Sequence, residues 1–205
     1  MQYVPLHLHT ENSLLDGAIR LKELCEYAKE NELPAIAITD HGVMYGNLEF
    51  YRTAKEYGVK PLLGCEFYVY DGDITERDST KTRNYHLVLI AKDKAGYQNL
   101  VKLTSIAHVD GFYRRPRINH RLLEQYNEGL ICLSACVQGE VARYILDGDV
   151  EKAEETAHYY KNLFKDDYYI EIQDHGLDVQ KRSNPDLIRI AKKLNIPLVI
   201  TNDSH

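Results

Sequence analysis

The sequence has no apolar run close to the roughly 20 residues that a membrane-spanning helix needs. Its N-terminus, MQYVPLHLHT, lacks the basic flank and the long apolar stretch of a secretory signal peptide. The four cysteines form no CxxC pair and no dense framework, which argues against a disulfide scaffold and favours a reducing compartment. We therefore expect a cytoplasmic protein without a membrane segment.

Basic side chains are too few for a protein that holds nucleic acid by bulk charge alone. Lys and Arg number 25 against 31 for Asp and Glu, so the formal net charge is −6. The hydrophobic content of 44% and the charged content of 27% are typical of a globular fold. A chain of 205 residues is long enough to bury its own core, so we expect residues 1–205 to form one domain.

Short apolar runs alternate with helical patterns along the chain. Several runs are rich in β-branched or aromatic residues and predict strands. They cover residues 4–9, 35–39, 62–70, 86–91, 130–134, 168–173 and 198–201. Runs such as Ala-Ile-Ala-Ile are almost unbroken, as in a parallel sheet that is buried on both faces.

Amphipathic patterns predict helices over residues 20–31, 47–57, 96–108, 119–126, 140–146, 151–164 and 185–194. Gly58 would end the second helix, and Pro185 after Asn184 is typical of a helix start. Alternating strands and helices predict an α/β fold with a parallel sheet and right-handed crossovers. We expect a (β/α)7 barrel, a distorted relative of the TIM barrel.

Two irregular stretches interrupt this pattern. Residues 71–84, which include Lys81 and Arg83, predict a polar surface loop. Residues 110–118 contain the segment GFYRRPRI, which mixes aromatic rings with three arginines. This segment is either a solvated loop that folds back on the barrel or a contact for nucleic-acid phosphates or a partner domain.

Potential metal ligands lie at or near the ends of the predicted strands, where barrels of this type carry their chemistry. His7 and His9 are two residues apart on a strand, so both imidazoles lie on one face. Asp203 and His205 have the same spacing. Glu66 lies in an apolar run, where a carboxylate is costly unless it is paired or bound to metal. The full set is His7, His9, Asp16, His41, Glu66, His86, Cys136, Asp203 and His205.

Some members of this set have ordinary alternatives. Asp16 is either a turn aspartate or a ligand that Gly17 lets fold back over the site. His41 precedes a glycine, which permits a turn that exposes the ring. Asp40 beside it is interpreted as a residue that orients a ligand or forms the turn.

Three further positions carry a weaker signal. His86 opens a strand rather than closing one. Cys136 is either a small buried hydrophobe or a thiolate ligand. His175, in Ile-Gln-Asp-His-Gly, is predicted to face the substrate rather than a metal. The remaining cysteines are assigned to the core, and His108, His120 and His158 receive no functional role.

A mixed set of imidazoles, carboxylates and a thiolate suits zinc, with manganese or iron also possible. Nine ligands are too many for one ion, so we expect two or three ions with Glu66 bridging. Such clusters generate hydroxide near neutral pH and clamp phosphoester oxygens. Their remaining positive charge favours an anionic phosphate substrate.

Seven segments resemble the PHP (polymerase and histidinol phosphatase) domain of bacterial DNA polymerase III alpha subunits: HLHTENSLLDG, AIAITDHGVMYGNLEFY, GVKPLLGCEFYV, AGYQNLVKLTS, EGLICLSAC, YIEIQDHG and VITNDSH. The resemblance implies that the nine residues match the metal positions of that family. It implies a first ion on His7, His9, Glu66 and Asp203, a second on Glu66, His86 and Cys136, and a third on Asp16, His41 and His205.

The resemblance further implies a role in DNA replication beside the remainder of the alpha subunit, with a DNA 3′ end as the substrate. The palm, thumb and fingers are missing, so we expect no polymerase activity from this chain. The leading hypothesis is a metal-dependent phosphoesterase, a 3′-5′ proofreading exonuclease that acts through a metal-bound hydroxide. The alternatives are a structural and interaction module stabilised by metals, and a hydrolase of small phosphates such as a phosphomonoester or pyrophosphate.

Overall fold

Strands and helices alternate along most of the chain in the computed structural model, which describes residues 3–14, 16–78, 80 and 83–205. The elements in chain order are α1 (Leu21–Glu30), β1 (Ala35–Ile38), α2 (Asn47–Tyr57), β2 (Lys60–Tyr70), β3 (Asn84–Ala91), α3 (Lys94–Val109), β4 (Arg117–Ile118), α4 (His120–Gln125), β5 (Leu130–Leu133), α5 (Glu140–Leu146), α6 (Val150–Phe164), the 3₁₀ turn Lys165–Asp167, β6 (Tyr168–Ile172), α7 (Asp178–Leu194) and β7 (Leu198–Ile200).

The strands that the described residues form make one curled sheet of seven, in the order β1-β2-β3-β5-β6-β7, with β4 paired to β2. Strand β3 runs antiparallel to both β2 and β5, while the other pairs are parallel. The expectation of an all-parallel sheet was therefore wrong. The stretch between β2 and β3 supplies no crossover helix in its described residues, and parallel neighbours need such a crossover. Lys81 of that stretch lies outside the described residues.

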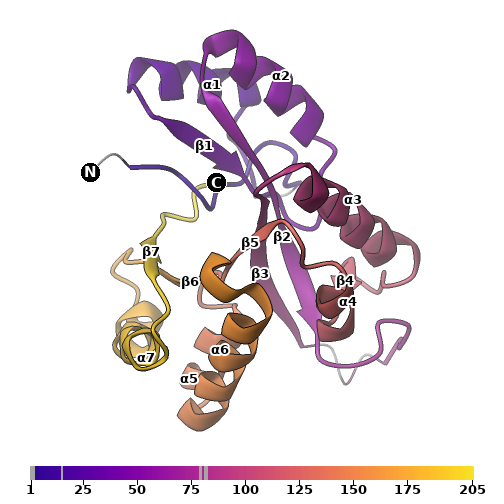
Figure 1. Ribbon diagram of the computed structural model, residues 1–205, viewed down its shortest axis with the longest axis vertical. Helices are drawn as coiled ribbons and strands as arrows, with labels where there is room; N and C mark the ends of the chain where they lie inside the picture. Colours follow the sequence, from indigo (N-terminus) through magenta and orange to yellow (C-terminus); the bar gives the residue numbers. More distant parts are fainter. Residues whose placement is uncertain (1–2, 15, 79, 81–82) are drawn as a thin grey trace.

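The first predicted strand, residues 4–9, is not a regular strand, but it lies between the two edge strands of the sheet. The amide of Ala37 donates to Pro5 O (2.9 Å), and the amide of His9 donates to Ser204 O (2.7 Å). The segment thus partly bridges β1 and the chain after β7. The C-terminal end of the chain accordingly lies near the middle of the molecule, beside the N-terminal segment (Figure 1). The architecture is a mixed α/β half-barrel. The sheet has seven strands because it includes β4, which lies in a stretch predicted to be irregular.

Side chains of the strands alternate between a helix-covered face and the concave face. Phe67 and Val69 of β2 belong to the largest core cluster, which α3, α5, α6 and α7 complete. Ala37, Val88 and Leu133 form a smaller cluster that draws residues from β1, β3 and β5. Figure 1 shows α1 and α2 together at the β1 end of the sheet and α5, α6 and α7 together at the other end.

Two helices show where local signals succeed and fail. The prediction for α2 is confirmed, and Gly58 ends it with φ 74° in the left-handed region that glycine favours. The predicted start at Pro185 was wrong, because α7 begins at Asp178 and Pro185 lies inside it. The buried face of α7 extends back through Ser183 to Gln180, so tertiary packing outweighs the cost of an interior proline.

No helix in the described part of the chain is long and apolar enough to span a bilayer. All four cysteines are free thiols, and only Cys136 is not fully buried. The expected cytoplasmic location stays a prediction.

A polar network is buried beneath α5, away from the predicted ligands. Glu140 Oε2 lies 2.9 Å from His120 Nε2 and accepts a hydrogen bond from the Tyr160 hydroxyl (2.8 Å). Burial alone would lower the pKa of His120, but the hydrogen bond to Glu140 and its charge raise it above the ordinary value. A protonated His120 therefore stabilises the folded state.

We predict that this stabilisation depends on pH. A raised folded-state pKa means that the contribution is complete below the unfolded pKa, about 6.5, and is lost as pH rises through the higher folded value. The free energy of unfolding should fall across that range by up to about 1 kcal/mol. Urea unfolding at a series of pH values measures it, and Glu140→Gln should flatten the profile. An identical pH profile in Glu140→Gln would contradict the assignment.

Candidate metal centre

The nine predicted ligands come from segments far apart in the sequence and meet at one end of the sheet. His7 and His9 lie on the bridging N-terminal segment, His41 follows β1, and Asp203 follows β7. His86 is opposite Tyr68 in the antiparallel β2–β3 register. Because β3 runs backwards, its first residues lie beside the last residues of β2. The strand direction that contradicts the all-parallel fold is therefore what brings His86 to this end.

The carboxylate of Glu66 is the centre of the cluster. It is 1% exposed and has histidine nitrogens around it. Its Oε1 lies 2.8 Å from His86 Nδ1 and 3.3 Å from His7 Nε2. Its Oε2 lies 3.6 Å from His9 Nε2 and is also in contact with His41 Nδ1. One carboxylate thus contacts four imidazoles, as a bridging ligand between ions would.

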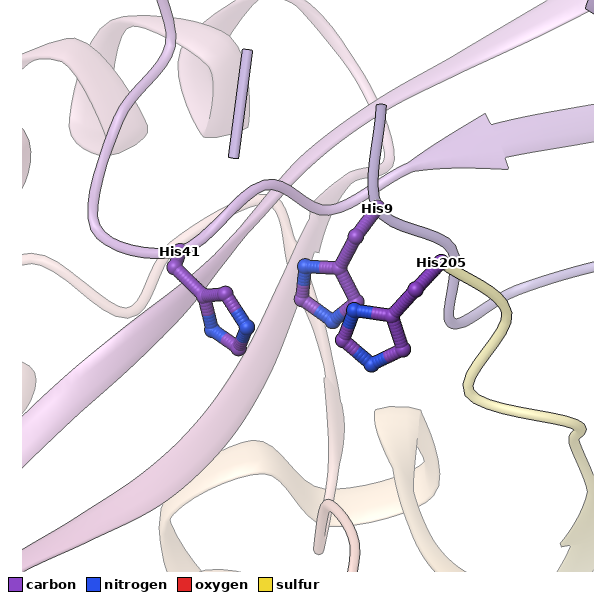
Figure 2. Close-up of side chains that lie close together, drawn as sticks. All are labelled: His9, His41 and His205. Atoms are coloured by element: carbon purple, nitrogen blue, oxygen red, sulfur yellow. The ribbon is translucent and has the colours of Figure 1, made fainter. Parts of the chain in front are cut away.

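The C-terminal residues complete the inner part of the cluster. Asp203 Oδ1 is 3.1 Å from His7 Nε2 and 3.2 Å from His9 Nε2. His205 Nε2 lies 3.4 Å from the same oxygen. Figure 2 shows the His9, His41 and His205 rings gathered from three separate segments. The His9 ring stacks on that of His41, with centroids 3.9 Å apart, and on that of His205, with centroids 4.5 Å apart.

Two predicted ligands lie at the periphery. Asp16 Oδ2 is 3.1 Å from His41 Nε2, and Cys136 Sγ is 3.8 Å from His86 Nδ1. The side chain of Asp16 is 48% exposed and that of His41 is 17% exposed, whereas Glu66 and both N-terminal histidines are fully buried. The cluster is thus closed on one side and open to solvent on the other.

The polar atoms of the cluster face one another without hydrogen-bond geometry. In the described chain, six buried atoms here have no hydrogen-bond partner: His7 Nε2, His9 Nε2, His41 Nδ1, both oxygens of Glu66 and Asp203 Oδ1. Buried polar atoms are normally satisfied, so such convergence needs an explanation. Two ligand atoms about 2.1 Å from a tetrahedral ion lie about 3.4 Å apart. The observed separations of Asp203 from His7, His9 and His205 are close to that spacing, so the residues fit divalent ions.

Electrostatics favour the charged forms of Glu66 and His7 but the neutral form of Cys136. Burial alone would raise the pKa of Glu66, but the charge of His86 and the contacts of His41 and His7 hold it well below its usual range. Burial alone would lower the pKa of His7, but the charge of Glu171 and its hydrogen bond raise it well above the ordinary value. Burial raises the pKa of the Cys136 thiol, so a neighbouring cation is needed to ionise it.

A second carboxylate, which the sequence reasoning missed, holds His7 in place. Glu171 is fully buried, and its Oε1 is 2.6 Å from His7 Nδ1. The same oxygen accepts from Gln173 Nε2 (2.8 Å) and from the Thr201 hydroxyl. Metal-bound histidines commonly donate their other ring nitrogen to such a carboxylate. Its position in an apolar run is the signal that identified Glu66, and it applied to Glu171 as well.

Asp40 is placed as an orienting residue, as one interpretation of the sequence had it. Its carboxylate accepts from the Ser13 hydroxyl (2.7 Å) and from the amide of Thr10 (2.7 Å). Ser13 Oγ in turn lies 3.2 Å from His9 Nδ1. Gly17 allows this turn to close, because a Cβ there would lie 1.9 Å from Thr10 O.

The turn that presents His41 is held by His108, a residue to which the sequence gave no role. Gly42 has φ 66°, and a Cβ on it would lie 2.6 Å from Pro116. Its amide donates to Glu66 O (2.8 Å), and its carbonyl oxygen is 2.8 Å from His108 Nε2. No local pattern marks a histidine on α3 as a partner of this distant turn.

His175, which the sequence analysis predicted to face the substrate, has no described contact with the metal-ligand cluster. Gln180 holds it, with its amide nitrogen 3.0 Å from His175 Nδ1, while the backbone amide of His175 donates to Gln180 Oε1 (2.8 Å). These contacts fix the loop before α7. A role facing substrate stays a prediction.

A curled α/β sheet with histidines and carboxylates gathered at one end defines the class as a candidate metal-dependent half-barrel protein. The chain belongs to the PHP domain family, whose sequence profile matches residues 5–175. It is 47% identical to the DNA polymerase III subunit alpha of Campylobacter jejuni and 46% identical to that of Treponema pallidum. Each alignment covers 100% of this chain but 18% of the relative, so the chain spans less than a fifth of these proteins.

Two solved structures share the fold at low sequence identity. One is a candidate metal-dependent phosphoesterase from Bifidobacterium adolescentis, with TM-score 0.52 and 16% identity, covering 100% of this chain and 88% of that chain. The other is an amidohydrolase from Chromobacterium violaceum with bound sulfate and no metal, with TM-score 0.60 and 15% identity, covering 98% and 87%. At 16% and 15% sequence identity, these two structures support a shared fold and nothing further.

We predict that the purified protein binds about two to three divalent ions per chain, because the ligand atoms are too many and too spread for one ion. His9→Ala and Glu66→Gln should each lose at least one equivalent. Elemental analysis after reconstitution with zinc or manganese measures this. His158→Ala, an exposed histidine on α6, is the control and should keep the full complement. Equal metal content in all variants would refute the site.

We predict that Glu171→Gln weakens zinc affinity by about 10- to 100-fold, because the orienting charge on His7 is lost while the shape is kept. Competition with a chromophoric chelator measures the affinity. The matched control is Glu49→Gln, at an exposed position on α2. Unchanged zinc affinity in Glu171→Gln would show that the His7 contact does not support metal binding.

Proposed function

We propose that this chain is a metal-dependent phosphoesterase that removes nucleotides from DNA 3′ ends, in the context of a polymerase alpha subunit. The observation that carries the proposal is the buried Glu66 carboxylate among four histidines, with unpaired ligand atoms converging beside it. The similarity to DNA polymerase III alpha subunits supports DNA as the substrate. The open side of the cluster supports catalysis rather than a purely structural site.

The proposed metal-holding residues are the nine ligands. Zinc is favoured by the histidines and Cys136, with manganese or iron also compatible. Bound divalent ions would lower the pKa of water and neutralise charge on a phosphoester. The chain itself contributes the orientation of those ligands: Glu171 holds His7, the Asp40–Ser13 pair holds His9, and His108 holds the His41 turn.

His41 and His86 lie on the accessible side of the cluster. Both line an open groove of about 580 Å³ that also reaches Asp16. A phosphoester entering from this groove would meet these side chains first, while His7, His9 and Glu66 stay beneath, shielded from bulk water. The closed side would thus hold the ions, and the open side would admit the substrate.

A second candidate function is a metal-stabilised structural module. One observation favours it: His7 and His9 lie on one segment and Asp203 and His205 on another, far apart in the sequence, so shared ions would join the two segments. Metal removal would then lower the melting temperature. If a chelator lowers the melting temperature but does not lower the rate of phosphoester hydrolysis, this candidate is supported over the first.

We predict that His9→Ala and Asp203→Ala lower the metal-stimulated release of nucleotides from a 5′-labelled single-stranded DNA by at least about 100-fold. Each change removes a ligand that faces the shared ions, and transition-state charge stabilisation of this kind is worth several kcal/mol. Gel analysis of the shortened products, with added Mn²⁺ or Zn²⁺ and with chelator, measures it.

The control for that assay is His158→Ala, which should cleave like the wild type. Nitrophenyl phosphomonoester and phosphodiester substrates, run in parallel, separate a hydrolase of small phosphates from a nuclease. Wild-type cleavage by both ligand variants would sink the proposal.

A further inference from the structure

An open groove leads from the metal cluster across the segment GFYRRPRI. Its volume of about 580 Å³ is in the range of sites that hold organic ligands. His41 and His86 lie at its cluster end. Tyr45 lines one part of it, and Phe112, Arg114 and Arg115 line another. The groove is thus continuous with the accessible ligands.

The three arginines of this segment have different environments. Arg117 is 1% exposed and donates to the carbonyl oxygens of Gly111 (3.0 Å), Ile74 (2.7 Å) and Glu76 (2.6 Å). It is a structural anchor that fixes the shape of the loop. The segment thus folds back on the sheet, as one interpretation of the sequence had it, but Arg117 is buried rather than solvated.

Arg114 and Arg115 are exposed and line the groove instead. The Arg115 guanidinium carbon lies 5.4 Å from the centre of the Tyr68 ring, and that of Arg114 lies 5.5 Å from the Tyr113 ring. These cation–π contacts orient the guanidinium groups and leave their N–H donors for another ligand. Two preoriented guanidinium groups beside a candidate phosphoesterase centre match the phosphates of a nucleic-acid strand.

Exposed aromatic rings accompany this positive charge. Tyr45 is 60% exposed and Phe112 is 51% exposed. The Tyr45 hydroxyl donates to Asn12 O (2.7 Å), and the Phe112 ring lies 6.2 Å from the ring of His108. Both rings are therefore held in position while their surfaces face solvent. Rings beside a charged groove are typical of single-strand binding, where unpaired bases stack on them.

We propose that this groove binds the terminal nucleotides of single-stranded DNA, with phosphates on Arg114 and Arg115 and bases stacked on Phe112 and Tyr45. This inference rests on the proposed function for its direction, with the 3′ end at the cluster. It adds the side chains that would select unpaired 3′ nucleotides of an oligonucleotide over a mononucleotide or a base-paired end. The net charge of −6 does not oppose it, because the contact is local.

The test measures binding apart from cleavage. The probe is a short fluorescent oligothymidylate with a 3′-terminal phosphorothioate linkage, and its affinity is followed by fluorescence anisotropy with Mn²⁺ and in EDTA. For Arg114→Ala/Arg115→Ala, we expect weaker binding and a salt-dependence slope lower by about 0.7 for each lost phosphate contact. The charge-preserving Arg114→Lys/Arg115→Lys should restore the slope.

Matched controls are Arg52→Ala/Arg182→Ala, which removes two exposed arginines from α2 and α7, and Tyr51→Ala, which removes an exposed ring from α2. Both should bind as the wild type does. Phe112→Ala should weaken binding roughly tenfold through loss of one stacking surface, and Phe112→Tyr should retain it. A blunt duplex of the same length should bind more weakly than the single strand.

The proposed binding would be overturned if Arg114→Ala/Arg115→Ala left the affinity and the salt-dependence slope unchanged. It would also be overturned if the wild type did not bind the oligonucleotide. The segment would then be assigned to contact with a protein partner. Failure of the proposed function gives a different result. If the wild type binds DNA through these arginines but cleaves no phosphoester, the binding proposal is supported and the phosphoesterase proposal is rejected.

Discussion

The carboxylate of Glu66 is the constraint on which the site depends. A buried carboxylate is unstable unless charges or ions offset its lost hydration. Here the offset comes from His7, His9, His41 and His86, which three separate segments contribute. The bridging N-terminal segment, the turn after β1 and the antiparallel strand β3 must all be in place before the carboxylate is neutralised. The fold and the cluster therefore support each other.

Around that carboxylate, acidic and basic groups are arranged in layers. Glu171 and Asp40 lie behind the histidines and fix their orientation, and Asp16 and Cys136 lie at the rim. This arrangement buries the inner ligands and leaves the rim more exposed. Such a site would suit the proposed hydrolysis, in which ions are retained while substrate and product exchange.

The segment GFYRRPRI combines one buried arginine with two exposed arginines. The Arg117 guanidinium donates hydrogen bonds to three carbonyl oxygens and so fixes the shape of the loop. That shape turns Arg114 and Arg115 toward the groove beside the cluster. Because Pro116 also lies close to Gly42, the same loop packs against the turn that presents His41. Substrate recognition and ligand placement would thus share one structural element.

The sequence by itself determined the local features: the bounds of α2, the place of Glu66 in an apolar run, and the positions of the nine candidate ligands. These follow from periodicity and residue chemistry within a few neighbouring positions. Only the tertiary structure decided the direction of β3, the passage of α7 through Pro185, and the partners of Glu171, His108 and Arg117. Each of these depends on a partner distant in the chain, and strand pairing and buried polar contacts leave no local periodic signal.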